Sequence, residues 1–321
     1  MSANATATAR ATARIADRTA AVPDSDRAHK RRLYFLYFVA IATNLAIFFY
    51  GFDYYKLSAM DRPFSPKHHL LRPSGPIGLY LGFMGVALFV GIFLYPIRKH
   101  WAWLGQKGKT RHWLDIHVLM GLTAPFIIAF HSTLKFRGIA GMAFWIMFAV
   151  SASGVVGRYL YAQIPRKVST AELSMKELQD LQESLSQELT AQRLLPEADL
   201  RALLRMPDKN RVGRLPIVLA LVYMMILDVV RYFRVARLRR HALTFGQSVG
   251  SLAGFLPTNH RELERAIHAA AEEAALLKRV LFLSRSQKVF HLWHVVHKPF
   301  SYAFAVLALL HITLQFVLGY F

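Results

Sequence analysis

The chain contains no cysteine among its 321 residues. This absence excludes disulfides, thiolate-ligated iron–sulfur clusters and covalently attached c-type haem within the chain. No Gly-rich dinucleotide-binding fingerprint is present either, so the sequence gives no sign of a nicotinamide or flavin domain. Any redox centre held by this chain must therefore be ligated by nitrogen, oxygen or methionine sulfur.

Acidic residues are scarce, because Asp and Glu number 19 against 40 Lys and Arg, which gives a formal charge of +21. Hydrophobic residues make up 54% of the chain, and several apolar runs reach the ~20 residues needed to cross a bilayer. The basic residues lie mainly between and beside these runs, which is typical of membrane topology rather than of nucleic-acid binding. We therefore expect an all-α integral membrane helical bundle in contact with lipid, without a nucleic-acid partner.

The apolar runs predict four transmembrane helices within residues 33–164 and a last one within residues 290–321. The first four are expected at 33–52, 77–97, 113–134 and 139–164. Residues 1–32 are rich in Ala, Thr and Arg and predict a disordered cytoplasmic tail, although a basic start without acids also suits a mitochondrial-type transit peptide. Residues 165–289 are basic and have apolar positions at helical spacing, so they predict a helical cytoplasmic insertion.

Residues 215–233 are apolar and just long enough to span, but they contain Asp228 and Arg231. Residues 158–298 carry 22 Lys and Arg, against 4 in residues 53–76 and 2 in residues 135–138. Because positive loops stay inside, both flanks of 215–233 should be cytoplasmic. This favours an interfacial or re-entrant helix and five spans in the inner (plasma) membrane with a cytoplasmic N-terminus, and a sixth span is the alternative.

Two of the predicted spans each carry a pair of histidines at the same separation. The third span has His117 and His131 (131 − 117 = 14), and the last span has His297 and His311 (311 − 297 = 14). Fourteen residues advance about 21 Å along an α-helix and return almost to the same face. Two such helices facing each other would form two bis-imidazole sites, one toward each side of the membrane. We therefore predict that these four histidines are the axial ligands of two b haems.

The pairing of the histidines depends on the topology. Five spans make the two helices parallel and pair His117 with His297 and His131 with His311. Six spans make them antiparallel and pair His117 with His311 and His131 with His297. In both cases each iron has two imidazole ligands and no open position, which suits electron transfer rather than bond chemistry.

Basic residues at the ends of the spans are candidate contacts for the haem propionates, although a basic residue there also serves as a topology anchor. The candidates are Arg111, Arg158 and Lys298 on the inner side and Lys135 and Arg137 on the outer side. Of the neighbouring histidines, His112, His291 and His294 are expected at the interface or as hydrogen-bond partners, with His294 a competitor of His297. His68 and His69 are expected to be an exposed polar pair on a loop.

The paired histidines of the third and last spans resemble those of the ferric-reductase-like and b561-type dihaem cytochrome b proteins. The resemblance covers residues 33–164 and 290–321 and implies electron transfer across the bilayer between two b haems. The flavin and nicotinamide domain that follows this core in full-length ferric reductases and NADPH oxidases is missing, and a long basic insertion precedes the last span. Both departures imply that the electron donor or acceptor is a separate subunit.

We therefore expect an electron-transfer subunit of an oxidoreductase complex rather than a complete enzyme. Its partners would be other redox subunits, a cytochrome or an iron–sulfur protein, and quinone is a candidate. One alternative is a proton or metal transporter that uses the histidines as titratable groups. Another is a non-redox membrane anchor whose basic region holds a partner protein.

Overall fold

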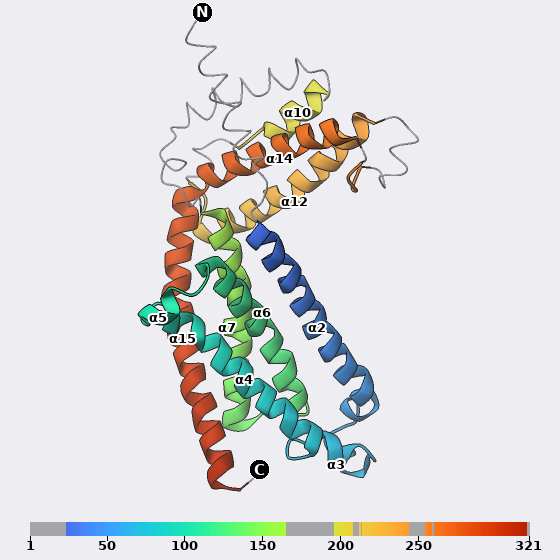
Figure 1. Cartoon of the computed structure of the whole chain (residues 1–321), viewed down its shortest axis with the longest axis vertical. Helices are drawn as coiled ribbons and strands as arrows, with labels where there is room; N and C mark the ends of the chain where they lie inside the picture. Colours follow the sequence, from blue (N-terminus) through green and yellow to red (C-terminus); the bar gives the residue numbers. More distant parts are fainter. Residues whose placement is uncertain are drawn as a thin grey trace, which may run out of the picture. The chain divides into compact units, whose positions relative to one another are not determined.

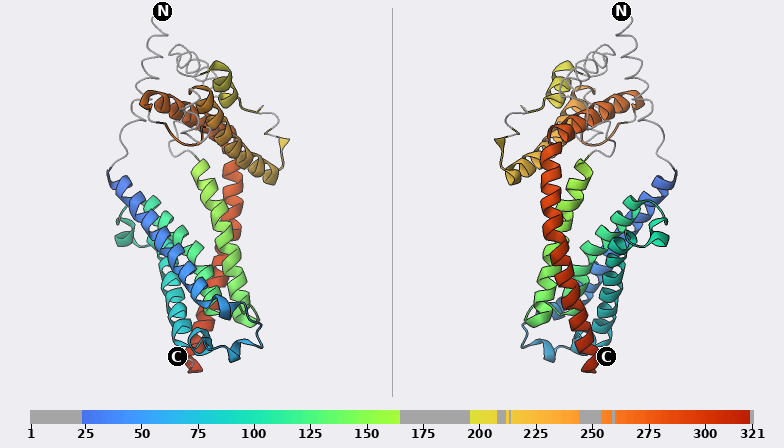
Figure 2. Two further views of the ribbon diagram at one scale, coloured as in Figure 1. Left: turned by 90° about the vertical axis from the view of Figure 1, so that its right-hand side faces the viewer. Right: turned by 90° about the vertical axis from the view of Figure 1, so that its left-hand side faces the viewer.

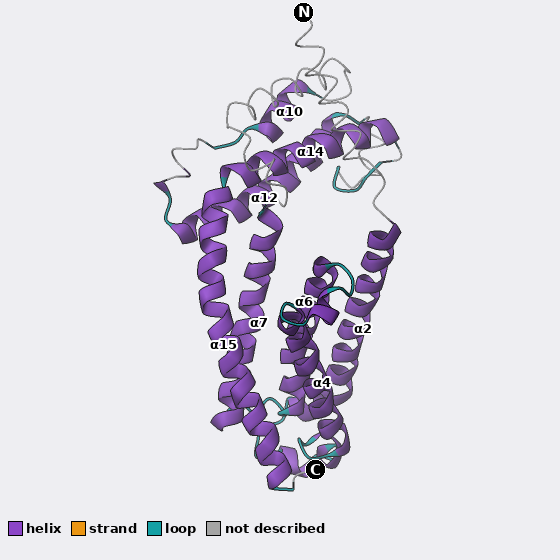
Figure 3. Cartoon of the chain, turned by 60° about the vertical axis from the view of Figure 1, so that its left-hand side comes forward, coloured by secondary structure: helices purple, strands orange, loops and turns teal. Residues whose placement is uncertain are grey.

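The computed structural model describes residues 24–164, 196–207, 212, 214–243, 254–258 and 260–319. In these ranges the regular elements are helices, without strands, so the predicted all-α fold is confirmed for the described part of the chain (Figures 1 and 3). The elements are α2 (Asp24–Tyr55), η1 (Arg62–Phe64), α3 (His68–Leu71), α4 (Pro76–Arg98), α5 (Ala102–Gly105), α6 (Thr110–His131), α7 (Gly138–Gln163), α10 (Glu197–Leu204), α12 (Ile217–His241), α14 (Arg261–Leu281) and α15 (Leu283–Val317).

Five of the described helical segments are long and apolar enough to cross a membrane. They are Asp26–Tyr55, His68–Arg98, Thr110–His131, Gly138–Gln163 and Leu283–Val317. Helix α12 is not among them, because Asp228 and the arginines from Arg231 onward interrupt its apolar run. The prediction of a helical membrane bundle is thereby confirmed, with five candidate spans.

The chain divides into two compact units. We call Val22–Tyr159 together with Leu292–Phe321 the bundle unit, and Leu160–His291 the insertion unit. Helix α15 contributes its first turns to the insertion unit and the remainder to the bundle unit. All four predicted haem ligands belong to the bundle unit.

Helix α2 starts earlier than the sequence predicts, so the expected disordered tail over residues 1–32 is wrong for residues 24–32. The reason is tertiary, because the first turns of α2 contact α6. The Lys109 ammonium lies 2.6 Å from the Asp26 carboxylate, and the His29 ring stacks on that of His112 with their centroids 3.6 Å apart. Residues 1–23 lie outside the described residues.

The bundle unit is held by close packing between neighbouring helices. One cluster of buried side chains joins α2, α3, α4 and α6 and consists of Tyr54, Tyr55, Leu71, Leu81, Ile127 and Phe130. Gly85 lets α4 approach α6, since a Cβ there would lie 2.3 Å from the Ile128 Cδ1 atom. Figure 2 shows α4 beside α6 and α7 beside α15, so the two histidine-bearing helices each have a close neighbour.

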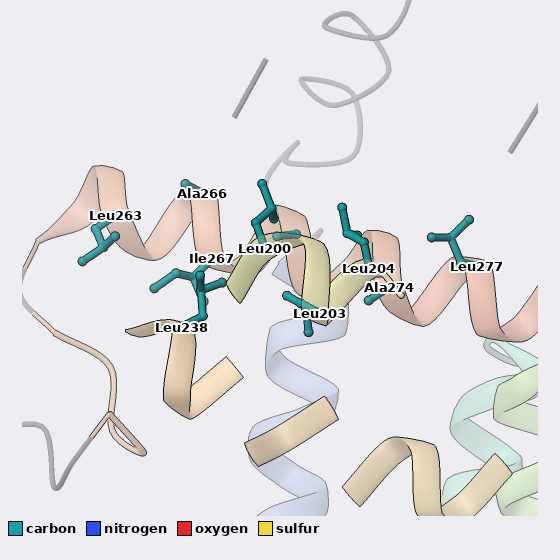
Figure 4. Close-up of a cluster of buried hydrophobic side chains, with 10 residues drawn as sticks. Leu200, Leu203, Leu204, Leu238, Leu263, Ala266, Ile267, Ala274 and Leu277 are labelled. Carbon is teal, nitrogen blue, oxygen red and sulfur yellow. The ribbon is translucent and has the colours of Figure 1, made fainter. Parts of the chain in front are cut away.

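The described part of the insertion unit is a small three-helix core. Buried leucines and alanines from α10, α12 and α14 meet there, with Leu203, Leu238 and Ile267 among the most buried (Figure 4). The Arg239 guanidinium donates to both carboxylate oxygens of Glu264, at 2.8 and 2.9 Å, and so ties α12 to α14. The predicted helical character of residues 165–195 lies outside the described residues.

Candidate functional site

The two histidines of α6 are oriented by backbone carbonyls of α4. The Nδ1 atom of His117 lies 3.0 Å from the Ile92 carbonyl oxygen, and that of His131 lies 2.8 Å from the Gly78 carbonyl oxygen. A carbonyl can only accept a hydrogen bond, so Nδ1 is the protonated nitrogen in both rings. The Nε2 atom of each ring is therefore left with a lone pair, which is the form that ligates a metal.

A proline explains why the Ile92 carbonyl is available. In an α-helix this carbonyl would accept from the N–H four residues later, but that residue is Pro96, which has none. His117 supplies the missing donor. Pro125 does the same in α6 by freeing the Gly121 carbonyl, which accepts instead from the Ser151 hydroxyl of α7 at 2.7 Å.

His297 on α15 is positioned by α7. The Ser153 hydroxyl donates to the Val150 carbonyl at 2.8 Å, so the 2.8 Å contact with His297 Nδ1 is one in which Ser153 accepts and the ring donates. The Trp293 indole N–H donates to the Ser153 carbonyl at 2.8 Å, and its ring centroid lies 4.5 Å from that of His297. His297 therefore has the same tautomer as His117 and His131, with Nε2 unprotonated.

The histidines of α6 and α15 neighbour one another in two pairs within the bundle unit. His297 interacts electrostatically with His117, and His311 interacts with His131. This order makes α6 and α15 parallel, which is the arrangement that five spans require. Each of the four rings is half-buried.

Glycines leave bare backbone beside these histidines. Gly121 lies one turn after His117, and a Cβ there would meet nothing within 4 Å. At Gly82 a Cβ would lie 2.8 Å from Cε1 of His131, so the ring rests against the α4 backbone. Bare backbone of this kind allows a flat group to approach closely.

The donor set fits bis-imidazole haem ligation. Among the described residues, no group of three or more His, Asp or Glu side chains gathers as a bare metal ion would need. The histidines instead come as pairs, and three of the four have Nδ1 bonded to a protein acceptor. A porphyrin supplies four nitrogens of its own, so two imidazoles complete its iron.

The predicted propionate contact Arg158 has another partner in the structure. Its guanidinium donates to the Asp115 carboxylate at 2.6 Å, and His29 Nε2 lies 3.2 Å from the other oxygen of that carboxylate. Asp115 is only 6% exposed, and a buried carboxylate requires such a cation. Sequence reasoning missed Asp115, although a lone acid inside the predicted span at 113–134 was a usable signal.

The other four predicted propionate contacts are exposed. They are Arg111 near the start of α6, Lys135 and Arg137 in the turn between α6 and α7, and Lys298 on α15. Of the neighbouring histidines, His112 stacks on His29, His294 is in electrostatic contact with His297, and His291 is exposed. The expectation of an exposed pair on a loop is wrong in two respects, because both residues belong to helix α3 and His68 is half-buried, with its Nδ1 atom 3.1 Å from the buried Tyr54 hydroxyl. His69 is exposed.

The turn after His131 is fixed by a buried arginine that sequence reasoning also missed. Thr133 and Leu134 have positive φ angles of 51° and 58°, a conformation that is costly for a β-branched residue. The Arg62 guanidinium donates to the Thr133 carbonyl and to those of Tyr55 and Leu57, the last two at 3.0 and 3.1 Å. Arg62 thereby ties the loop before α4 to the C-terminal end of α6, directly beside a candidate ligand.

No protein-family model, curated protein or solved structure matches this chain. Its function is therefore inferred from its own residues.

Proposed function

We propose that this chain is the membrane subunit of a redox complex and transfers electrons through two b-type haems. His117 and His297 would hold one haem, and His131 and His311 would hold the other. The observation that carries the proposal is that Nδ1 of three of these rings is hydrogen-bonded to a protein acceptor. In metal sites that second contact fixes the tautomer and the ring orientation of the ligating histidine.

The same contacts favour electron transfer over a proton path. A histidine that relays protons exchanges them at both ring nitrogens, so each nitrogen needs a partner that can give or take a proton. The partners of His117 and His131 at Nδ1 are the carbonyls of Ile92 and Gly78, which can do neither. These two rings are thus suited to binding through Nε2 and not to shuttling.

A haem held by two imidazoles would supply a one-electron carrier without an open site for oxygen or substrate. The chain's residues hold the rings in place: α4 carbonyls orient the two α6 histidines, and Ser153 with Trp293 orients His297. The fourteen-residue separation spaces the ligands on each helix by about 21 Å, most of the hydrocarbon thickness.

The partners follow from what the chain does not supply. Because the sequence has no dinucleotide fingerprint, we propose that a separate cytochrome or iron–sulfur subunit, or quinone, gives or takes the electrons. From the excess of Lys and Arg in the insertion, we also propose that the spans lie in the plasma membrane and that the insertion and the N-terminus are both cytoplasmic. We propose that this organisation is that of the dihaem core of the ferric-reductase-like and b561-type proteins.

Haem counts in histidine variants test the ligands and their pairing together. Each single change, His117→Ala, His131→Ala, His297→Ala or His311→Ala, should leave one haem per chain. The double variant H117A/H297A should also leave one, because both changes fall on the same site, whereas H117A/H311A should leave none. His69→Ala, exposed on α3, is the control and should keep both haems.

Two outcomes would contradict the proposal in different ways. Retention of both haems in every single variant would reject these residues as ligands. One haem in H117A/H311A and none in H117A/H297A would keep the ligands but reverse their pairing. A folded, colourless wild-type protein would favour the transporter or anchor alternatives.

A further inference from the structure

Helix α12 of the insertion unit has an uncovered apolar face. Eight large apolar side chains on it are 46–70% exposed: Val218, Leu219, Val222, Met225, Ile226, Val229, Tyr232 and Phe233. At 100° per residue these positions fall within an arc of about 140°. They therefore form one continuous stripe, which we call the α12 stripe, and contiguous apolar patches of this kind mark an interaction surface.

The rest of α12 is firmly packed, so the stripe is not a consequence of a loosely held helix. Leu238 is fully buried in the core with α10 and α14. The Lys278 ammonium of α14 lies 2.5 Å from the Asp228 carboxylate of α12, and Arg239 is bonded to Glu264. The insertion unit thus presents the α12 stripe on a fixed support.

A neighbouring loop extends the stripe. The Phe255 ring lies 5.6 Å from that of Tyr232 and 5.9 Å from that of Phe233, measured between centroids, and both Phe255 and Leu256 are more than a third exposed. Gly254 allows the loop to sit there, because its φ is +88° and a Cβ would lie 2.2 Å from the Ala236 carbonyl oxygen. Aromatic rings at one end of an apolar stripe are typical of the water–lipid boundary.

The basic end of the stripe has two arginines. By helical position, Arg237 and Arg240 lie on the same side of α12 as the stripe, one to two turns beyond Phe233. Arg237 is paired with Asp199, at 3.1 Å between Nε and Oδ1, so the positive charge facing a lipid surface comes mainly from Arg240, which is exposed. Asp228 is the one acid in the sequence of α12. It lies off the stripe and is bonded to Lys278 and to Arg231, the latter at 3.2 Å. The surface is therefore apolar and cationic, which complements an anionic lipid headgroup layer.

We propose that the α12 stripe, with Phe255 and Leu256, lies in the headgroup boundary of an anionic leaflet as an interfacial helix. The insertion unit is joined in sequence to candidate spans at both ends, α7 and α15, so a bilayer is always within reach and the effective concentration of lipid is high. This inference specifies the lipid-facing residues and the lipid class, and it does not depend on the haem proposal.

The lack of cysteine makes the test direct, because a single introduced cysteine can carry a spin label in the full-length protein. We would label Val222→Cys and Val229→Cys on the stripe and Glu272→Cys on α14, whose carboxylate side chain is 59% exposed. The protein is placed in nanodiscs of equal parts phosphatidylcholine and phosphatidylglycerol. Collisions with oxygen report lipid, and collisions with a water-soluble nickel chelate report water.

The labels at 222 and 229 should be accessible to oxygen and shielded from the nickel chelate, and the label at 272 should show the reverse. Nickel accessibility at 222 and 229 equal to that at 272 would overturn the proposal. Shielding of 222 and 229 from both reagents would also overturn it, because the stripe would then be covered by protein.

A second arm tests the lipid class. Arg240→Gln, on the side of the stripe, should raise the nickel accessibility of the label at 229, whereas Arg265→Gln, exposed on α14, should leave it unchanged. Nanodiscs of phosphatidylcholine alone should raise it as well. The requirement for an anionic surface would be refuted if the label at 229 had equal nickel accessibility in R240Q and R265Q. It would also be refuted if removing the anionic lipid left that accessibility unchanged.

Discussion

Replacing Ser153 by alanine should raise the midpoint potential of one haem and leave the other unchanged. The Ser153 hydroxyl lies 2.8 Å from His297 Nδ1 and, because its own hydrogen is donated to the Val150 carbonyl, it accepts a hydrogen bond from the ring. An accepted hydrogen bond makes the imidazole a stronger electron donor, which stabilises ferric iron more than ferrous iron. Its removal therefore favours reduction.

The size of the effect follows from the energy of one hydrogen bond. Such a bond is worth about 1 kcal/mol net, and 1 kcal/mol corresponds to about 40 mV for a one-electron couple. Only the difference between the two oxidation states contributes, so an increase of about 20–40 mV is expected. Ser153→Thr keeps the hydroxyl and should restore the original value.

Potentiometric titration monitored through the visible α-band measures this shift. The matched control is Ser151→Ala, also on α7, whose hydroxyl donates to the Gly121 carbonyl and not to a histidine. A shift in S153A no larger than that in S151A, or an equal shift of both haems, would refute the role assigned to Ser153.

Two further changes test the packing of each unit. Gly157→Ala should destabilise the bundle unit by about 1–3 kcal/mol through overpacking, because its Cβ would lie 2.2 Å from the Trp293 ring. Gly154→Ala is the control and should leave the stability unchanged, because its Cβ would meet nothing within 4 Å. Equal thermal unfolding midpoints of the two variants would contradict this. Burial tends to raise the pKa of Glu264, but hydrogen bonds from Arg239 and Thr258 outweigh it and leave the pKa below its ordinary value of 4.5. Because the folded pKa is depressed, this stabilisation is full above pH 4.5 and is lost as the pH falls through the folded pKa. Hydrogen exchange in α14, corrected for its intrinsic pH dependence, should therefore accelerate on acidification in the wild type and not in Glu264→Gln, and a parallel response of the two proteins would reject the link.

Hydropathy predicted the spans well because a long apolar run is a local property. The predicted span at 77–97 became α4 (Pro76–Arg98), and the one at 139–164 became α7 (Gly138–Gln163). The equal separations of the histidines were also visible without any structure. These features need no knowledge of which residues meet in space.

Tertiary contacts account for what the sequence did not predict. The early start of α2 depends on the pairing of Asp26 with Lys109, which lie far apart in the chain. Pro96 indicates in the sequence that the Ile92 carbonyl lacks its helical hydrogen bond, but only the packing of α4 on α6 shows that His117 donates to this carbonyl. In the same way, the bond between Arg158 and Asp115 joins residues 43 positions apart in the chain, and only the packing of α7 on α6 shows it.

The reduced visible spectrum of the purified protein, combined with a haem assay, tests the central claim most directly. Dithionite-reduced protein should show the sharp α-band of low-spin bis-imidazole haem b, with two haems per chain. A correctly folded protein without this band, or with one haem per chain, would contradict the account.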